Sequence, residues 1–141
     1  MANEIKDILN MGYKRDEMME KLIEHVTNIA MTKGYEALSK IEANIYHIGV
    51  LENDLNKRGF GEYFKHTKGK YVNDTLEFLQ EIEDFNLYYL LDGANKIYIS
   101  KLSEEDKLVE YTELDEEYFE LDEEIWEYYG KCIKYVKNNM D

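Results

Sequence analysis

Acidic side chains are concentrated in one segment of the sequence, residues 102–130. This segment contains thirteen aspartates and glutamates and a single base, Lys107, so it carries a charge of −12 within a chain whose net charge is −14. Carboxylates in this number attract cations or basic proteins, and they repel nucleic acid and anionic membranes. The chemistry that the sequence offers is therefore electrostatic recognition of a positively charged partner.

Part of the acidic segment repeats every seven residues, as LDEEYFE from Leu114 and LDEEIWE from Leu121. Apolar residues recur there at steps of three and four, which predicts an amphipathic helix laid on a globular core. Its apolar stripe consists of Leu114, Tyr118, Leu121, Ile125, Tyr128, Cys132 and Tyr135. Two heptads are too short to indicate a coiled coil.

Glutamates occupy the helix positions outside that stripe. Carboxylates three or four residues apart on a helix lie about 5–6 Å from one another. Duplex DNA presents one negative charge per ~1.7 Å of its axis, so a row of carboxylates can meet the same lysines and arginines. The residues predicted to bind a partner are Glu113, Glu116, Glu117, Glu120, Glu123, Glu124 and Glu127, with Asp115 and Asp122 as second choices. The alternative is that these acids form only a solvated face.

A stretch that superficially resembles a calcium-binding loop, DLNKRGFGEYFK, begins at Asp54. Asp54, Asn56 and Gly59 match the first, third and sixth positions of such a loop. Arg58 and Lys65 stand at the fifth and twelfth positions, where the loop needs oxygen ligands. Because two cations there would oppose Ca²⁺, we reject a calcium site.

Catalytic and metal-binding signatures do not stand out elsewhere. His25, His47 and His66 are scattered and show no spacing typical of a zinc or di-iron site. The only cysteine, Cys132, falls on the apolar stripe and is predicted to be buried. Neither a nucleophile elbow nor a phosphate-binding glycine loop is present. The sequence therefore predicts a protein that is not an enzyme, with no catalytic residue, metal site or cofactor.

Length and composition indicate the broad class of the protein. A chain of 141 residues suits one domain, and the absence of proline suits long uninterrupted helices. A single cysteine fits a reducing compartment. No apolar run approaches the ~18 residues of a membrane span, and the N-terminus lacks the pattern of a signal peptide. We expect a cytoplasmic protein that contacts neither membrane nor nucleic acid directly.

Hydrophobic periodicity predicts helices over most of the chain. The ranges are residues 2–11, 15–33, 35–57, 72–82 and 85–99, followed by the acidic C-terminal segment. No hairpin signal is present. The expected fold is all-α, a single compact domain of five to seven helices over residues 1–141.

The stretch RGFGEYF, residues 58–64, interrupts this helical pattern. Gly59 can end the preceding helix in a conformation that costs other residues about 1–2 kcal/mol. Phe60 is then expected to turn back onto the core, and Gly61 to let the backbone pass close to a neighbour. Tyr63 and Phe64 are expected to begin a short helical turn. We interpret the stretch as a structural corner whose aromatic rings are buried.

The same region resembles a bacterial all-helical domain family that includes a dimeric DNA-mimic protein. In that family a helix ends in Glu-Val-Asn-Asn-Gly-Gly-Phe, and one residue, Gln-Tyr-Phe and a polar glycine loop follow. The matching residues are Asn56, Gly59, Phe60, Tyr63, Phe64 and the loop glycine Gly69. A later acidic Leu-Asp pattern before the last helix is matched by residues 114–135.

The resemblance covers residues 45–138, and the N-terminal helices of residues 1–44 lie outside it. Lys57, Arg58 and Glu62 depart from the family pattern. The resemblance implies an all-helical fold and a DNA-mimic activity, and it leaves homodimer formation open.

Three functional hypotheses follow. The leading one is an acidic binding protein without enzymatic activity that engages the basic surface of a partner such as a DNA-binding transcription factor, by imitating duplex DNA. The second is an immunity or antitoxin-type protein whose acids mask the basic active site of a toxic enzyme. The third is a carboxylate-dependent metal enzyme, which would require acids from different helices to converge.

Overall fold

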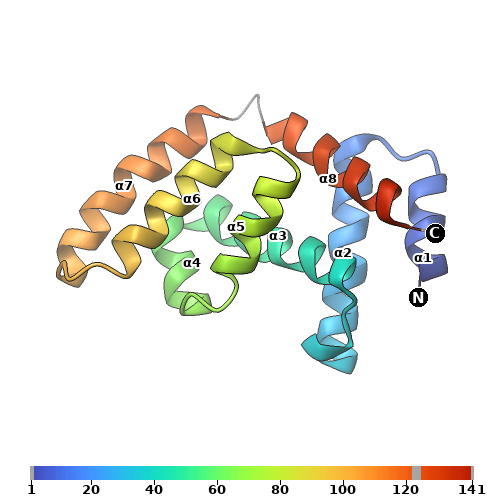
Figure 1. Cartoon of the computed structure of the whole chain (residues 1–141), viewed down its shortest axis with the longest axis horizontal. Coiled ribbons are helices and arrows are strands. Elements are labelled where there is room, and N and C mark those ends of the chain that lie inside the picture. Colours follow the sequence, from blue (N-terminus) through green and yellow to red (C-terminus); the bar gives the residue numbers. More distant parts are fainter. Residues whose placement is uncertain (1, 122–124, 141) are drawn as a thin grey trace. The chain divides into compact units, whose positions relative to one another are not determined.

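The computed structural model describes residues 2–121 and 125–140 and is built from helices (Figure 1). It is 83% helical, and its described residues contain no strand. The helices are α1 (Ala2–Asn10), α2 (Arg15–Lys33), the 3₁₀ helix η1 (Tyr35–Ala37), α3 (Lys40–Lys57), α4 (Phe60–Thr67), α5 (Val72–Glu81), α6 (Phe85–Tyr98), α7 (Glu104–Glu120) and α8 (Ile125–Asn139). The all-α class is confirmed, with eight α-helices in the described ranges instead of five to seven.

Two features of the chain account for the additional helices. Residues 60–67 form the complete helix α4 instead of a short turn, and the acidic segment contains two helices, α7 and α8. The predicted helix 35–57 is also divided. Its first residues form η1, and α3 then begins after Ser39. There the Ser39 backbone N–H donates to Glu42 Oε1 (2.8 Å), and the Glu42 N–H donates to Ser39 Oγ (3.2 Å). This reciprocal pair is a capping box, which sets the start of α3.

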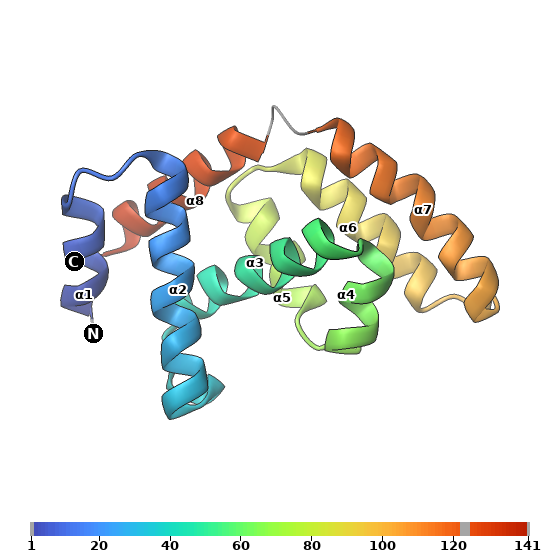
Figure 2. The same cartoon turned by 180° about the vertical axis from the view of Figure 1, so that it is seen from behind.

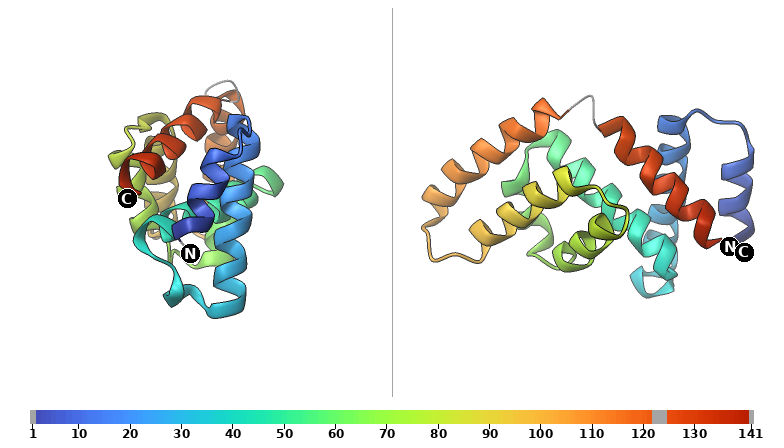
Figure 3. Two further views of the ribbon diagram at one scale, coloured as in Figure 1. Left: turned by 90° about the vertical axis from the view of Figure 1, so that its right-hand side faces the viewer. Right: turned by 45° about the horizontal axis from the view of Figure 1, so that its top comes forward.

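The chain divides into two compact units. The first consists of residues 1–49 and 124–141, and the second of residues 50–123. In the first unit, α2 packs against α1, η1 and α8 (Figure 3). Its buried apolar residues are Ile5, Met18, Met19, Leu22, Val26, Ile29, Ile45, Ile48, Tyr128, Cys132, Ile133 and Val136.

In the second unit, α6 lies between α5 and α7, and α4 contacts both α6 and α7 (Figures 1 and 2). Its buried apolar residues are Leu51, Leu55, Phe60, Tyr63, Phe64, Val72, Leu76, Phe78, Leu79, Ile82, Leu87, Leu90, Leu91, Ala94, Tyr111 and Tyr118. None of the helices in the described ranges is long and apolar enough to cross a membrane.

The sequence predicted that the heptad stripe of the acidic segment lies along one helix. The structure instead divides the stripe between two helices. α7 ends at Glu120, and α8 begins at Ile125. Tyr118 is buried in the second unit, where its ring lies 6.4 Å from that of Phe60 between centroids. Cys132 is buried in the first unit. A step of three or four residues is shared by every helix with one buried face, so periodicity alone does not reveal this break.

The RGFGEYF stretch forms the end of α3 and most of α4, and its aromatic residues belong to the core. Phe60, Tyr63 and Phe64 each expose at most 2% of their surface. The Phe64 ring stacks on Tyr98 of α6 and on Tyr111 of α7, with centroid distances of 4.6 Å and 6.0 Å. The predicted burial is confirmed, and Phe64 joins three helices of the second unit.

Replacing Phe64 by Ala should lower the free energy of unfolding by about 3–5 kcal/mol, because it removes a buried ring and leaves a cavity. Urea denaturation followed by circular dichroism measures this loss. Phe85→Ala is a suitable control, since Phe85 is 46% exposed at the start of α6. Equal stability of the Phe64→Ala variant and the wild type would contradict the packing described here.

Candidate protein-interaction surface

Helix α7 is fixed to α4 by a hydrogen bond at the start of α4. The Phe60 backbone N–H, which has no partner within α4, donates to Asp115 Oδ1 at 2.8 Å. Gly59 precedes it with φ +94°, and a Cβ at that position would overlap the Asp115 carboxylate. Only glycine therefore fits here, both for its backbone conformation and for the space that the carboxylate needs.

This contact gives Asp115 a structural position. The residue is half-buried, and burial raises the pKa of its carboxyl group, although the hydrogen bond from Phe60 favours the charged form. The sequence had named Asp115 as a second choice for partner binding. Its carboxylate instead points toward the start of α4, so it contributes less to the outer face of α7 than the exposed glutamates do.

A second close contact sets the rotation of α7 about its own axis. A Cβ on Gly61 would lie 3.3 Å from Tyr111 Cδ2 and 3.4 Å from Leu108 Cδ2. The sequence predicted that the backbone at Gly61 passes close to a neighbour, and that neighbour is α7. Burial, with smaller contributions from Glu104 and Tyr98, raises the pKa of Tyr111 to about 12.

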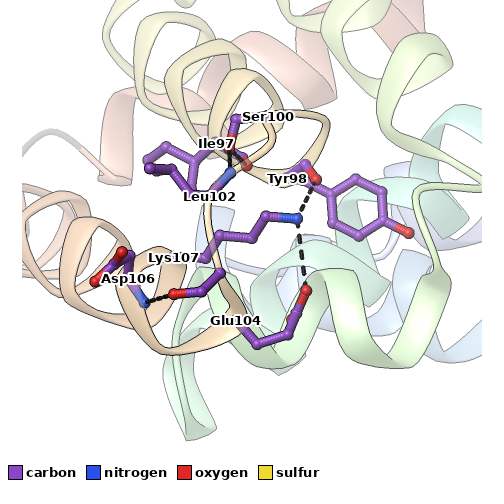
Figure 4. A network of polar contacts seen from close by, with 8 residues as sticks. Ile97, Tyr98, Ser100, Leu102, Glu104, Asp106 and Lys107 are labelled. Atoms are coloured by element: carbon purple, nitrogen blue, oxygen red, sulfur yellow. Dashed lines mark hydrogen bonds and ion pairs between the residues drawn. The ribbon is translucent and has the colours of Figure 1, made fainter.

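Lys107, the only base in the acidic segment, faces inward (Figure 4). Its side chain is 12% exposed. Lys107 Nζ donates to the backbone oxygen of Tyr98 at 2.8 Å and lies 3.5 Å from Glu104 Oε1. It also lies 5.7 Å from the centre of the Tyr98 ring. The single cation of α7 therefore holds the turn between α6 and α7 and leaves the outer carboxylates without a basic neighbour on their own helix.

The outer face of α7 carries seven exposed carboxylates. They are Glu105, Asp106, Glu110, Glu113, Glu116, Glu117 and Glu120. Within residues 2–121 and 125–140, none of the seven takes part in an ion pair. In Figures 1 and 2, α7 lies at one edge of its unit, and none of the described helices of that unit covers its other side.

Helix stability does not explain this distribution of charge. At the start of α7, the acids favour the helix dipole, and Ser103 Oγ accepts the Asp106 N–H at 3.1 Å. At the other end, no base stands in the last turn. There the pair Glu113 and Glu117 and the pair Glu116 and Glu120 have the four-residue spacing at which like charges repel by a few tenths of a kcal/mol. The acids near the C-terminus of α7 therefore oppose the helix that carries them.

The remaining predicted partner-binding residues follow α7 in the sequence. Glu127 is exposed in the first turn of α8, which belongs to the first unit. Asp122, Glu123 and Glu124 lie outside the described residues. The structure thus brings Glu113, Glu116, Glu117 and Glu120 together on one helix.

Three exposed apolar residues on α7 were not predicted from the sequence. Leu108, Val109 and Phe119 expose 60%, 62% and 55% of their surface. The sequence did contain a signal of their exposure, because none of the three falls on the apolar stripe that includes Leu114 and Tyr118.

The remaining candidate chemistry is structural. Asp54 is buried on α3, and its Oδ2 lies 3.0 Å from Nδ1 of the exposed His66. The rejected calcium loop is formed by the end of α3 and the start of α4. In the part of the chain that the structure describes, no group of three or more histidines, cysteines and acids could hold a metal ion.

The role of Asp115 predicts a pH dependence. Its raised pKa means that the folded protein binds this proton more tightly than the unfolded chain, so Asp115 favours folding less as the pH rises through that pKa. Asp115→Asn keeps an acceptor oxygen without a charge. The stability of the wild type relative to Asp115→Asn should therefore increase on acidification from pH 7 to pH 4.

Urea denaturation of the wild type and of Asp115→Asn at each pH measures the difference between their free energies of unfolding. The contributions of the other carboxylates are the same in both proteins and cancel in this difference. Asp115→Ala, which removes the acceptor, should be less stable than Asp115→Asn at both pH values. A constant difference between wild type and Asp115→Asn would show that burial does not perturb this carboxylate.

Comparison with known protein families gives a match over most of the chain. The model of a family described as DMP19-like protein matches residues 36–139. The match covers more than half of the chain, from η1 to the end of α8, and includes both the RGFGEYF stretch and α7. Searches of curated proteins and of solved structures found no match. The resemblance seen in the sequence is confirmed, and the chain belongs to the DMP19-like protein family.

Proposed function

We propose that this protein is an acidic binding protein without enzymatic activity, and that the outer face of α7 engages the basic surface of a DNA-binding protein in the manner of a DNA mimic. The observation that carries the proposal is the one-sided charge of α7. Its only base, Lys107, is turned toward Tyr98, and seven carboxylates are exposed without ion pairs in the described ranges. Membership of the DMP19-like family supports the proposal.

The spacing of the charges suits this function. The 17 residues of α7 extend for about 25 Å at a rise of ~1.5 Å per residue. Seven outward carboxylates over that length correspond to roughly one charge per 3.6 Å. One strand of duplex DNA carries one phosphate per ~3.4 Å. A surface built to neutralise a DNA strand therefore meets a similar linear density of negative charge on α7.

Electrostatic recognition also predicts how association depends on salt. Long-range attraction between an acidic helix and a basic surface accelerates encounter, and salt screens this attraction beyond ~8 Å at physiological ionic strength. Binding through α7 should therefore weaken steeply as salt is raised, mainly through a slower association rate.

Replacing Glu113, Glu116 and Glu120 by Lys should abolish partner capture while the fold is retained, because exposed substitutions usually change stability by less than ~0.5 kcal/mol each. The chain offers a matched control. Glu17, Glu20 and Glu24 on α2 are exposed, have the same three- and four-residue spacing, and give the same change in net charge when replaced by Lys.

Each variant is immobilised, incubated with lysate of the native host and washed at low salt. Mass spectrometry then identifies the proteins that are retained. DNA-binding proteins should be captured by the wild type and by the α2 control, lost with the α7 variant, and displaced by added duplex DNA. Equal capture by the α7 variant would refute the proposal. Captured proteins that duplex DNA does not displace would argue against mimicry.

A further inference from the structure

The outer face of α7 differs from a purely anionic surface because two exposed apolar side chains, Leu108 and Phe119, lie at its border. Leu108 and Phe119 are eleven residues apart, so they lie on nearly the same side of the helix, about 16 Å apart along its axis at ~1.5 Å per residue. Both are more than half exposed. The side chain of Leu108 is near Gly61 of α4, and the ring of Phe119 lies 5.6 Å from that of Tyr118.

The exposed Thr112 and the half-buried Asp115 lie between Leu108 and Phe119 on the same side of the helix, and acidic rows run beside them. Glu116 and Glu120 lie on the side of the helix next to Phe119. The exposed Val109 precedes Glu116 by seven residues, so it lies on the same side as these two acids. The face of α7 therefore presents an apolar edge, formed by Leu108 and Phe119, and an acidic flank.

From this arrangement we infer that the occupant of the α7 face is a basic amphipathic helix of the partner protein. Its apolar side chains lie against Leu108 and Phe119, and its lysines or arginines lie against Glu113, Glu116 and Glu120. This inference rests on the proposed function and specifies the partner surface. A DNA strand attracts basic proteins through its phosphates alone. Exposed leucine and phenylalanine are stabilised in addition when apolar groups of a partner cover them and remove them from water.

Charge complementarity decides against a second copy of this chain as the occupant. Two α7 faces in a symmetric contact would place carboxylates against carboxylates, since a two-fold interface pairs the same patch on both subunits. The seven exposed acids of each copy would then repel one another. A basic helix instead offers cations to the acidic flank and apolar groups to the apolar edge, which is the usual mode of recognition of an amphipathic helix.

The test uses two synthetic helical peptides of equal length and equal positive charge. The first has leucines in one row, spaced four and seven residues apart, with lysines beside them. The second has glutamines in place of the leucines. Isothermal titration measures the affinity of each peptide for the wild type, for Leu108→Ser/Phe119→Ser, and for the control Phe85→Ser/Tyr89→Ser, whose residues are exposed on α6. Circular dichroism checks the fold of each variant.

The wild type and the α6 control should bind the leucine peptide at least tenfold more tightly than the glutamine peptide. Leu108→Ser/Phe119→Ser should lose this preference and bind both peptides equally. The preference should persist at about 1 M salt, where the screening length falls to about 3 Å, while the affinity for the glutamine peptide is lost.

Failure of the inference is distinguishable from failure of the proposed function. If the wild type shows no preference, or if Leu108→Ser/Phe119→Ser retains it, the inference is overturned. The proposed function stands in that case, provided that replacing Glu113, Glu116 and Glu120 by Lys removes salt-dependent binding of the glutamine peptide. If that replacement has no effect on either peptide, both fail.

Sedimentation velocity of the protein alone tests the remaining occupant. The wild type and Leu108→Ser/Phe119→Ser should sediment identically. A dimer that this double replacement converts into a monomer would show that a second copy covers the face, and it would overturn the inference.

Discussion

The contact between α4 and α7 determines what the second unit can present to a partner. Helix α7 has nine acids and one lysine among 17 residues, so its sequence alone does not hold it in place. The Asp115 carboxylate accepts the Phe60 N–H, Gly59 leaves the space for it, and Phe64 stacks on Tyr98 and Tyr111. These contacts fix which side of α7 is buried, and the other acids are exposed as a consequence.

The same contact explains why one carboxylate differs from the rest. Asp115 lies on the buried side of α7, where it is partly removed from water and replaces a missing helix hydrogen bond. Lys107 lies on that side too and satisfies a carbonyl oxygen at the end of α6. One acid, Asp115, and the one base of α7, Lys107, therefore bind α7 to α4 and α6. What remains on the outside has one sign, and the like-charge repulsion it causes is offset by packing on the inside.

The sequence predicted much of the fold because the signals involved were local. The helices over residues 15–33, 72–82 and 85–99 were recovered nearly to the residue, since each has an apolar face of its own. The burial of Phe60, Tyr63 and Phe64 was predictable because Gly-Phe-Gly interrupts a helical pattern at a corner. The division between α7 and α8 was not, because their apolar residues keep a common step across residues 121–124.

The candidate site was predictable in its charge but not in its detail. Acidic composition indicated the segment, and helical spacing indicated Glu113, Glu116, Glu117 and Glu120. The inward turn of Lys107 depends on a carbonyl oxygen in another helix, which composition does not reveal. The exposure of Leu108 and Phe119 depends on which side of α7 faces α4, and this is set by Gly61 and Asp115. Long-range contacts of this kind are outside the reach of periodicity.

On the α7 face, the charges would raise the rate of encounter with a partner, and the apolar contact would raise the affinity. Screened attraction between exposed charges raises the rate of encounter with any basic protein, and each exposed ion pair contributes little to affinity, typically under ~1 kcal/mol. A protein that relied on its carboxylates alone would therefore associate with many DNA-binding surfaces and remain on few. Leu108 and Phe119 are exposed beside those carboxylates, and apolar burial is insensitive to screening, contributing about 25 cal/mol per Å² removed from water. An acidic flank that collects basic partners and an apolar edge that selects among them would together account for the two kinds of exposed side chain on α7.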